Sequence, residues 1–217
     1  MNNRYSAAAL TVSRSEKKIF ENLSFSISSG LLLKLVGPNG SGKSTLLKTL
    51  AGLIEPDHGD IDYSDQSVML DHEWISENIC YLGHKNALKR EFTILDNIRF
   101  WAEIWGTTEK IDFALKSMGI DYLRDTPVRY LSSGQTRRAA LARSMCHPAK
   151  IWLFDEPTVG LDERGLSLLS KAMQSHLDQD GIILCATHVD LGLDQKITET
   201  LDLAEFSAQS QFEKREI

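Results

Sequence analysis

Residues 37–45 read Gly-Pro-Asn-Gly-Ser-Gly-Lys-Ser-Thr, and this stretch decides the fold. It fits the phosphate-binding loop pattern G-x-x-x-x-G-K-[ST]. Glycines let the backbone wrap closely around an anion, and successive N–H groups then form an anion cradle. A helix that starts here adds its positive N-terminal end. The sequence therefore predicts a nucleoside triphosphate site made of Gly37, Pro38, Asn39, Gly40, Ser41, Gly42, Lys43, Ser44 and Thr45.

Two residues at the end of this loop carry the expected chemistry. The Lys43 ammonium can reach the terminal phosphates, and the Ser44 hydroxyl can ligate Mg²⁺. The flanking sequence favours a strand–loop–helix unit. The apolar run 31–36 leads directly into the loop, and residues 44–53 carry leucines at helical spacing.

A second stretch, 151–156, reads Ile-Trp-Leu-Phe-Asp-Glu. The apolar residues predict a buried strand, and two carboxylates follow at its carboxyl end, where ligands bind in open α/β sheets. Asp155 is placed to hold Mg²⁺ through water, and Glu156 is placed to act as general base for an attacking water. The alternative is a strand that simply ends at solvent, and the upstream phosphate loop argues against it.

A third stretch, 131–135, reads Leu-Ser-Ser-Gly-Gln and precedes a predicted helix over 136–146. Ser132, the Gly134 backbone and the helix N-terminus form a potential phosphate site. Taken in isolation, the same residues fit an ordinary serine N-cap better.

The rest of the chain alternates strands with helices, which favours a mainly parallel sheet. The polar tail after Phe206 is a candidate for disorder. Residues 92–147 are expected to be mostly helical. Strands are expected within 4–36 and 60–70 and over 79–82, 151–154 and 182–186, and a further helix over 163–177.

Composition narrows the class of protein. The 217 residues carry a formal net charge of −6, so a basic face and a nucleic-acid partner are not expected. No apolar run approaches the roughly 20 residues that span a bilayer, and the N-terminus lacks a secretory apolar region. Any function at a membrane would need another chain to supply the membrane-spanning part.

Cys80, Cys146 and Cys185 lie far apart and are expected to be buried, reduced thiols.

These motifs, in this order, resemble those of the ATP-binding cassette (ABC) family over roughly residues 4–200. The three stretches look like its Walker A loop, Walker B strand and signature. Val159-Gly160-Leu161-Asp162 resembles its D-loop, and Ala186-Thr187-His188 resembles its switch histidine. The resemblance implies an α/β P-loop NTPase with a mainly parallel core sheet, an antiparallel β subdomain and an α-helical insert. It implies one domain over 1–217, with a RecA-like core and β subdomain (1–83 and 149–205) and a helical subdomain (84–148).

The resemblance also implies a mechanism that needs two copies of the chain. Two cassettes pair head to tail, and each ATP, with Mg²⁺, lies between the Walker loop of one copy and the signature of the other. Ser132 and Gly134 would then contact a nucleotide held by the partner copy, and Asp162 would communicate across the interface. His188 would contact the γ-phosphate and help to orient Glu156 and the water. The helical insert would press on a membrane partner.

Two positions depart from the family pattern. His84 stands where the family usually has a glutamine that meets Mg²⁺ or the attacking water. We expect His84 to replace that glutamine in function, although a surface loop histidine is the alternative. Arg14 stands where the family often stacks a tyrosine on adenine. It could stack its guanidinium on the base, but a solvated loop residue fits it better.

A narrower resemblance is to the heme exporter ATPases of bacterial cytochrome c maturation. It rests on Tyr81–His84, on the run 93–101 and on Leu131–Gln135 followed by Arg137 and Arg138. It implies a role in heme export or heme handling, with integral inner-membrane permease subunits and heme delivery proteins as partners. The chain would then lie peripherally on the cytoplasmic face of the bacterial inner membrane.

Two other functions stay open on the sequence alone. A soluble, non-transport ABC ATPase would act as a nucleotide-gated clamp. Repair proteins of that kind usually insert a long coiled coil, and no heptad run is present here. Soluble translation factors usually carry two cassettes in one chain. A small-molecule kinase would use the same phosphate loop, but it would explain neither 131–135 nor 186–188.

Overall fold

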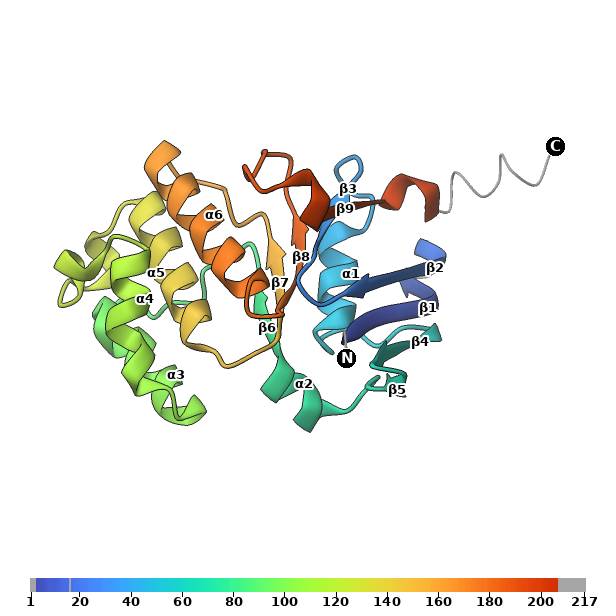
Figure 1. The fold of residues 1–217 in the computed structure, drawn as a ribbon, viewed down its shortest axis with the longest axis horizontal. Helices are drawn as coiled ribbons and strands as arrows, with labels where there is room; N and C mark the ends of the chain where they lie inside the picture. Colours follow the sequence, from blue (N-terminus) through green and yellow to red (C-terminus); the bar gives the residue numbers. More distant parts are fainter. Residues whose placement is uncertain (1–2, 16, 207–217) are drawn as a thin grey trace.

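The computed structural model describes residues 3–15 and 17–206, and its central feature is a five-stranded parallel sheet (Figure 1). Every neighbouring pair of strands in it is parallel, which confirms the expected core. All strands therefore end at the same edge, and the loops that follow them meet there. The strand order is β6 (Ile79–Leu82), β7 (Ile151–Asp155), β8 (Ile182–Ala186), β3 (Leu32–Val36) and β9 (Thr198–Asp202).

Side chains of the central strands alternate between two hydrophobic cores, one on each face of the parallel sheet. In β7, Ile151 and Leu153 join one core, whereas Trp152 and Phe154 join the other. Strands β7 and β8 are buried on both faces, which is why their sequences are continuous apolar runs.

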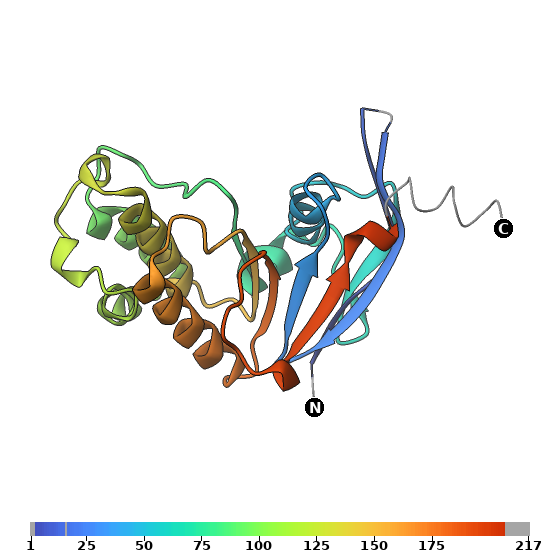
Figure 2. The same ribbon diagram turned by 90° about the horizontal axis from the view of Figure 1, so that it is seen from above.

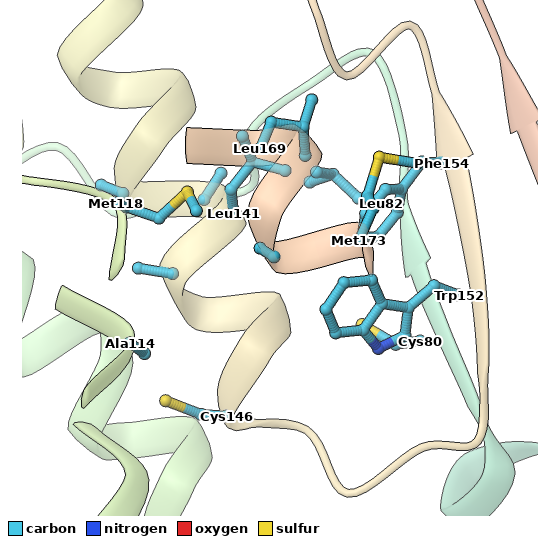
Figure 3. Close-up of a cluster of buried hydrophobic side chains, with 14 of the residues drawn as sticks. Cys80, Leu82, Ala114, Met118, Leu141, Cys146, Trp152, Phe154, Leu169 and Met173 are labelled. Atoms are coloured by element: carbon cyan, nitrogen blue, oxygen red, sulfur yellow. The ribbon is translucent and has the colours of Figure 1, made fainter. Parts of the chain in front are cut away.

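Helices cover both faces of this sheet (Figures 1 and 2). Helix α1 (Lys43–Leu50) packs on one face, and α5 (Ser133–Cys146) and α6 (Glu163–Leu177) pack on the other. Figure 3 shows the core on the second face, to which α5 contributes Leu141, α6 contributes Leu169 and the sheet contributes Phe154.

A four-stranded antiparallel sheet lies on the far side of α1 (Figure 1). Its strands run in the order β2 (Lys17–Ser28), β1 (Arg4–Arg14), β4 (His58–Tyr63) and β5 (Gln66–Ser67). Helix α1 is sandwiched between the two sheets and shares one hydrophobic core with both. This confirms the expected antiparallel sheet.

Three helices, α3 (Ile94–Trp105), α4 (Ile111–Ser117) and α5, come between β6 and β7 in the chain. Helix α3 begins at a capping box formed by Thr93 and Asp96, and it ends where Gly106 takes a left-handed φ of 65°. The three helices confirm the expected helical character of 92–147. The division into subdomains at 84–148 stays a prediction.

Two predicted helix boundaries were wrong. Helix α1 ends at Leu50, not residue 53, because Gly52 has a φ of 67° that cannot continue a right-handed helix. Helix α5 begins at Ser133, not residue 136, because Ser132 is its N-cap.

Sequence reasoning assigned no element to helix α2 (His72–Asn78) or to strand β9. The predicted disorder of the tail after Phe206 lies outside the described residues. Short 3₁₀ helices complete the described chain at Thr108–Lys110, Asp121–Leu123, Val128–Tyr130, Gln195–Ile197 and Leu203–Phe206.

Cys80, Cys146 and Cys185 are buried and unpaired, as expected. Within residues 3–15 and 17–206, no helix is long and apolar enough to cross a membrane.

Candidate active site

The predicted site residues gather at the carboxyl edge of the parallel sheet. Asp155, the last residue of β7, lies in register with Ala186, the last residue of β8, and Ala186 lies in register with Leu35 of β3. The phosphate loop, Glu156 and His188 follow these three strand ends. The fold thus brings together segments that are far apart in the sequence.

The loop between β3 and α1 needs glycine at specific points. Gly42 has a φ of 101°, and a Cβ there would lie 2.8 Å from Ile19 Cγ2. Gly37 has a φ of 130°, and its Cβ would lie 2.8 Å from Ser41 Oγ. Helix α1 then begins without a side-chain cap and without an acidic residue in its first turn. Its first N–H groups have no intrahelical acceptor, so this end of α1 can receive a phosphate.

The Lys43 side chain lies over this loop. Its Nζ donates hydrogen bonds to the carbonyl oxygens of Gly37 at 2.7 Å and Pro38 at 3.0 Å. The residue is buried, with 8% of its surface exposed. A phosphate that enters the loop therefore meets a positive charge that is already held beside it.

Ser44 and Asp155 come together from distant parts of the chain. Ser44 Oγ donates to Asp155 Oδ1 at 3.0 Å, and Asp155 is buried. A hydroxyl and a carboxylate oxygen are the hard donors that suit Mg²⁺, which usually keeps waters and phosphate oxygens as its other ligands. Among the described residues no cluster of three His, Cys, Asp or Glu side chains could hold a metal. The Ser44–Asp155 pair therefore fits Mg²⁺ bound together with a nucleotide.

Glu156 follows β7 in a backbone conformation that is rare for this residue type. Its φ is 50°, in the left-handed region, and its N–H donates to the Ala186 carbonyl at 2.8 Å. Its Oε1 lies 3.8 Å from His188 Nε2, and the carboxylate keeps partial access to solvent. Such backbone strain costs about 1–3 kcal/mol and is typical of functional sites. The structure thus pairs the predicted base with the predicted switch histidine.

Two threonines connect the loops after β7 and β8. Thr158 Oγ1 and Thr187 Oγ1 lie 3.1 Å apart, and both side chains are buried. Sequence reasoning missed this pair, because two ordinary threonines give no signal of pairing.

The motif 131–135 lies on another part of the molecule from the phosphate loop. Helix α5, which this motif begins, packs on the opposite face of the sheet from α1 (Figure 1). Ser132 and Gln135 form a capping box, which confirms the N-cap interpretation of Ser132.

Gly134 packs tightly against the D-loop, since a Cβ there would lie 2.5 Å from the Gly160 carbonyl oxygen. Asp162 caps α6, and its Oδ1 accepts from the Gly165 N–H at 2.8 Å. The signature and the D-loop are therefore in contact within one chain.

His84 and Arg14 are both exposed. His84 follows β6 at the same sheet edge as Glu156, and Arg14 ends β1. The rings of Tyr5 and Phe20, the aromatic residues closest to Arg14 in the sequence, are fully buried, so neither can stack on a nucleotide base. The roles of His84 and Arg14 stay predictions.

Sequence reasoning also missed the position of Arg137, which is buried at 3% exposure. Desolvation by burial lowers the pKa of its guanidinium, and the carboxylates of Asp155 and Glu156 oppose that shift. The sequence carried no signal of this burial, because buried residues lie on all sides of α5 and leave no apolar stripe that would mark one face.

A cavity of about 560 Å³ lies elsewhere, between α4, α6 and the start of β7. It is lined by residues such as Phe113, Trp152 and His176, and by none of the predicted site residues. This cavity is therefore separate from the candidate active site.

Comparisons with known proteins agree with this geometry. The family model described as ABC transporter matches residues 20–159. The chain is 41% identical over 194 residues to the cytochrome c biogenesis ATP-binding export protein CcmA of Agrobacterium fabrum, covering 87% of this chain and 91% of the relative. It is 39% identical over 188 residues to the protein of the same name from Vibrio cholerae, covering 85% and 91%.

Solved structures show the same architecture. An ABC transporter ATP-binding protein from Pyrococcus furiosus superposes with a TM-score of 0.80 at 26% identity, covering 94% of this chain and all of that one. The structure of cbiO1 from Clostridium perfringens, part of the ABC transporter complex cbiONQ, gives a TM-score of 0.72 at 27% identity, covering 87% and 80%.

Proposed function

Because the chain belongs to the ABC transporter family, we propose that it is the ATP-hydrolysing subunit of a membrane complex that serves cytochrome c biogenesis. The observation that carries this proposal is the sheet edge where Ser44 meets Asp155 and Glu156 faces His188. Relatives named for ATP-dependent export in cytochrome c biogenesis support the specific role. The relatives named here give no support for a soluble clamp, and membership of the ABC transporter family argues against a small-molecule kinase.

Residues 37–45 bind the phosphates of ATP. The N–H groups at the start of α1 receive the anion, and Lys43 transfers its hydrogen bonds from the loop carbonyls to the terminal phosphates. Ser44 and Asp155 would hold Mg²⁺, which when bound neutralises charge on the phosphate oxygens.

Hydrolysis needs a base next to the terminal phosphate. Glu156 accepts a proton from the attacking water, and its position beside His188 keeps the carboxylate at the sheet edge. His188 donates a hydrogen bond to the γ-phosphate. His84, exposed on the neighbouring loop, would offer a ring nitrogen to the same water or to Mg²⁺.

The second half of each site comes from another copy of the chain. Ser132 and Gly134 start α5 on the far side of the sheet from the phosphate loop, which suits contact with a nucleotide bound to a partner copy. Asp162 lies in the loop that contacts Gly134, so a shift at one nucleotide site can be transmitted through it to the other. The working unit is therefore an ATP-sandwiched homodimer.

The helical insert 84–148 contacts the membrane partner. Helix α3 exposes Phe100, Trp101 and Ile104, and the Trp101 ring stacks on Trp105 at a centroid distance of 5.4 Å. A groove of about 230 Å³ runs beside Trp101 and Trp105 toward Tyr81 and Ala87. Exposed aromatic patches of this kind mark interaction surfaces. We assign them to integral inner-membrane permease subunits, which would hold the chain at the cytoplasmic face and receive heme from delivery proteins.

Co-purification from membranes tests the function and this docking surface together. The wild-type chain should co-purify with integral membrane subunits, and the purified complex should show heme absorbance. Ile104→Glu places a charge on the patch and should weaken association about 30-fold, the effect of losing one interface anchor. Leu53→Glu is the matched control, since Leu53 is 63% exposed and Ile104 61%. A complex without integral subunits would reject the function, and equal recovery of both variants would reject the docking surface.

The proposed role of His84 is tested by ATPase assays on the assembled complex. His84→Ala should lower kcat because it removes the ring nitrogen, whereas His84→Gln should keep most activity because the amide oxygen can take its place. Lys85→Ala, at the exposed neighbouring position, serves as control. Unchanged activity in both His84 variants would show that His84 is an ordinary surface residue.

A further inference from the structure

All five N–H donors of Arg137 have acceptors within the chain. Nε donates to the Pro157 carbonyl at 3.1 Å. Nη2 donates to the carbonyls of Asp155 at 3.0 Å and Glu156 at 2.8 Å. Nη1 donates to the Gly83 carbonyl at 3.0 Å and to Asn86 Oδ1 at 2.9 Å.

These acceptors belong to two loops that matter for hydrolysis. Three are the consecutive carbonyls 155–157, which form the turn that carries Glu156. Two lie at Gly83 and Asn86, on either side of the loop residue His84. Arg137 itself lies in the second turn of α5, after the signature residues. One buried side chain therefore joins the signature helix, the base and the His84 loop.

We propose that Arg137 is a positioning residue for ATP hydrolysis, which fixes the left-handed turn at Glu156 and ties it to the signature helix α5. Glu156 is held at a φ of 50° by its own N–H bond to Ala186 and by the Arg137 bonds to the carbonyls around it. Such a conformation persists only where the surroundings over-determine it. Arg137 supplies that constraint.

In the paired enzyme, which rests on the proposed function, Arg137 would also link the two ATP sites. A shift of α5 that closes Ser132 and Gly134 on the partner's nucleotide would also move the Arg137 guanidinium. The turn at Glu156 would follow, because three of the five hydrogen bonds end there. Closure of the partner's site and alignment of the chain's own base are thereby linked inside one chain.

Arginine suits this role in a way that lysine does not. Its planar fork presents donors in fixed directions, whereas a lysine ammonium has three donors at one point. Arg137→Lys keeps the charge but cannot reach both loops. We expect kcat to fall by about 100-fold, the effect of misplacing a catalytic group by roughly 1 Å. The affinity of the isolated chain for ATP should change less than about 3-fold, since the phosphate loop is untouched.

The matched control is Arg138→Lys. Arg138 is the next residue on α5, and it makes only longer bonds, at 3.5 Å to the Met118 carbonyl and 3.3 Å to the Gly119 carbonyl. The kcat of Arg138→Lys should stay near that of wild type. An equal loss in both variants would mean that α5 is simply sensitive to substitution, and it would overturn the inference.

A double-mutant cycle separates positioning from general structural support. If Arg137 acts through Glu156, Arg137→Lys should cause no further loss in a Glu156→Gln background. Additive losses would overturn the proposal. In the nucleotide-free chain, the Glu156 amide, which donates to Ala186, should exchange its hydrogen faster in Arg137→Lys than in Arg138→Lys.

A milder variant covers the case in which Arg137→Lys fails to fold. Asn86→Ala removes one acceptor at the rim of the network and should lower kcat by about 2–10-fold, with ATP affinity kept. A wild-type kcat in this variant would overturn the link to the His84 loop. If instead the wild-type complex hydrolyses no ATP, the proposed function itself fails, which is a distinct result.

Discussion

Replacing Glu156 with glutamine is expected to slow ATP turnover by about 10²–10⁴-fold while ATP still binds. Glutamine has the same shape, so the left-handed turn and its backbone bonds to Ala186 and Arg137 should survive. What disappears is the carboxylate that accepts the proton of the attacking water. Single-turnover and steady-state ATPase assays on the assembled complex measure the loss.

The same variant should accumulate as an ATP-bound dimer. The two copies still close on ATP, but the hydrolysis that would let them separate does not occur. Light scattering with Mg²⁺ and ATP should show a doubled mass for Glu156→Gln and a monomer without nucleotide. Glu77→Gln makes the same substitution at an exposed site on α2 and should behave as wild type. Rapid hydrolysis by Glu156→Gln would remove Glu156 from the role of base.

The second large effect is expected at Lys43. Hydrogen bonds to a charged group contribute about 1.5–3 kcal/mol, so Lys43→Ala should weaken ATP binding by about 10–100-fold. The buried ammonium, held 2.7 Å from the Gly37 carbonyl, has no substitute in the loop. Titration of the isolated chain with ATP by calorimetry measures this loss directly.

Lys48→Ala provides the comparison, since Lys48 is exposed on the same helix as Lys43. Thermal unfolding of both variants without nucleotide reports any loss of stability. Lys43→Ala should also fail to dimerise with ATP, in contrast to Glu156→Gln. Unchanged ATP affinity in a folded Lys43→Ala chain would contradict the assignment of the phosphate loop.

Elements with apolar patterns were predictable from the sequence, and polar ones were not. Strand β8 was predicted at its observed bounds because its buried faces make it a continuous apolar run. Helix α2 was missed because none of its residues is buried, and its start depends on the Asp71 side-chain cap. Strand β9 was missed because Leu201 is its only apolar residue, so no apolar run or alternation marks it.

The candidate site was predictable where a motif names the side chain. Lys43, Ser44, Asp155 and Glu156 belong to such motifs, and the fold brings them to one edge. The Arg137 network was not predictable, because four of its five acceptors are backbone carbonyls. Any residue type offers a carbonyl, so only the folded turn after β7 reveals where the guanidinium donates.

The charge on strand β9 affects how readily two copies of the chain aggregate. It is the last strand of the parallel sheet, next to β3, and Glu199 and Thr200 are exposed on it. An uncovered sheet edge can recruit a strand from another molecule, and charged side chains oppose that aggregation. When two copies approach through this edge, their Glu199 carboxylates repel each other. Glu199 therefore opposes edge-to-edge pairing of two copies through β9.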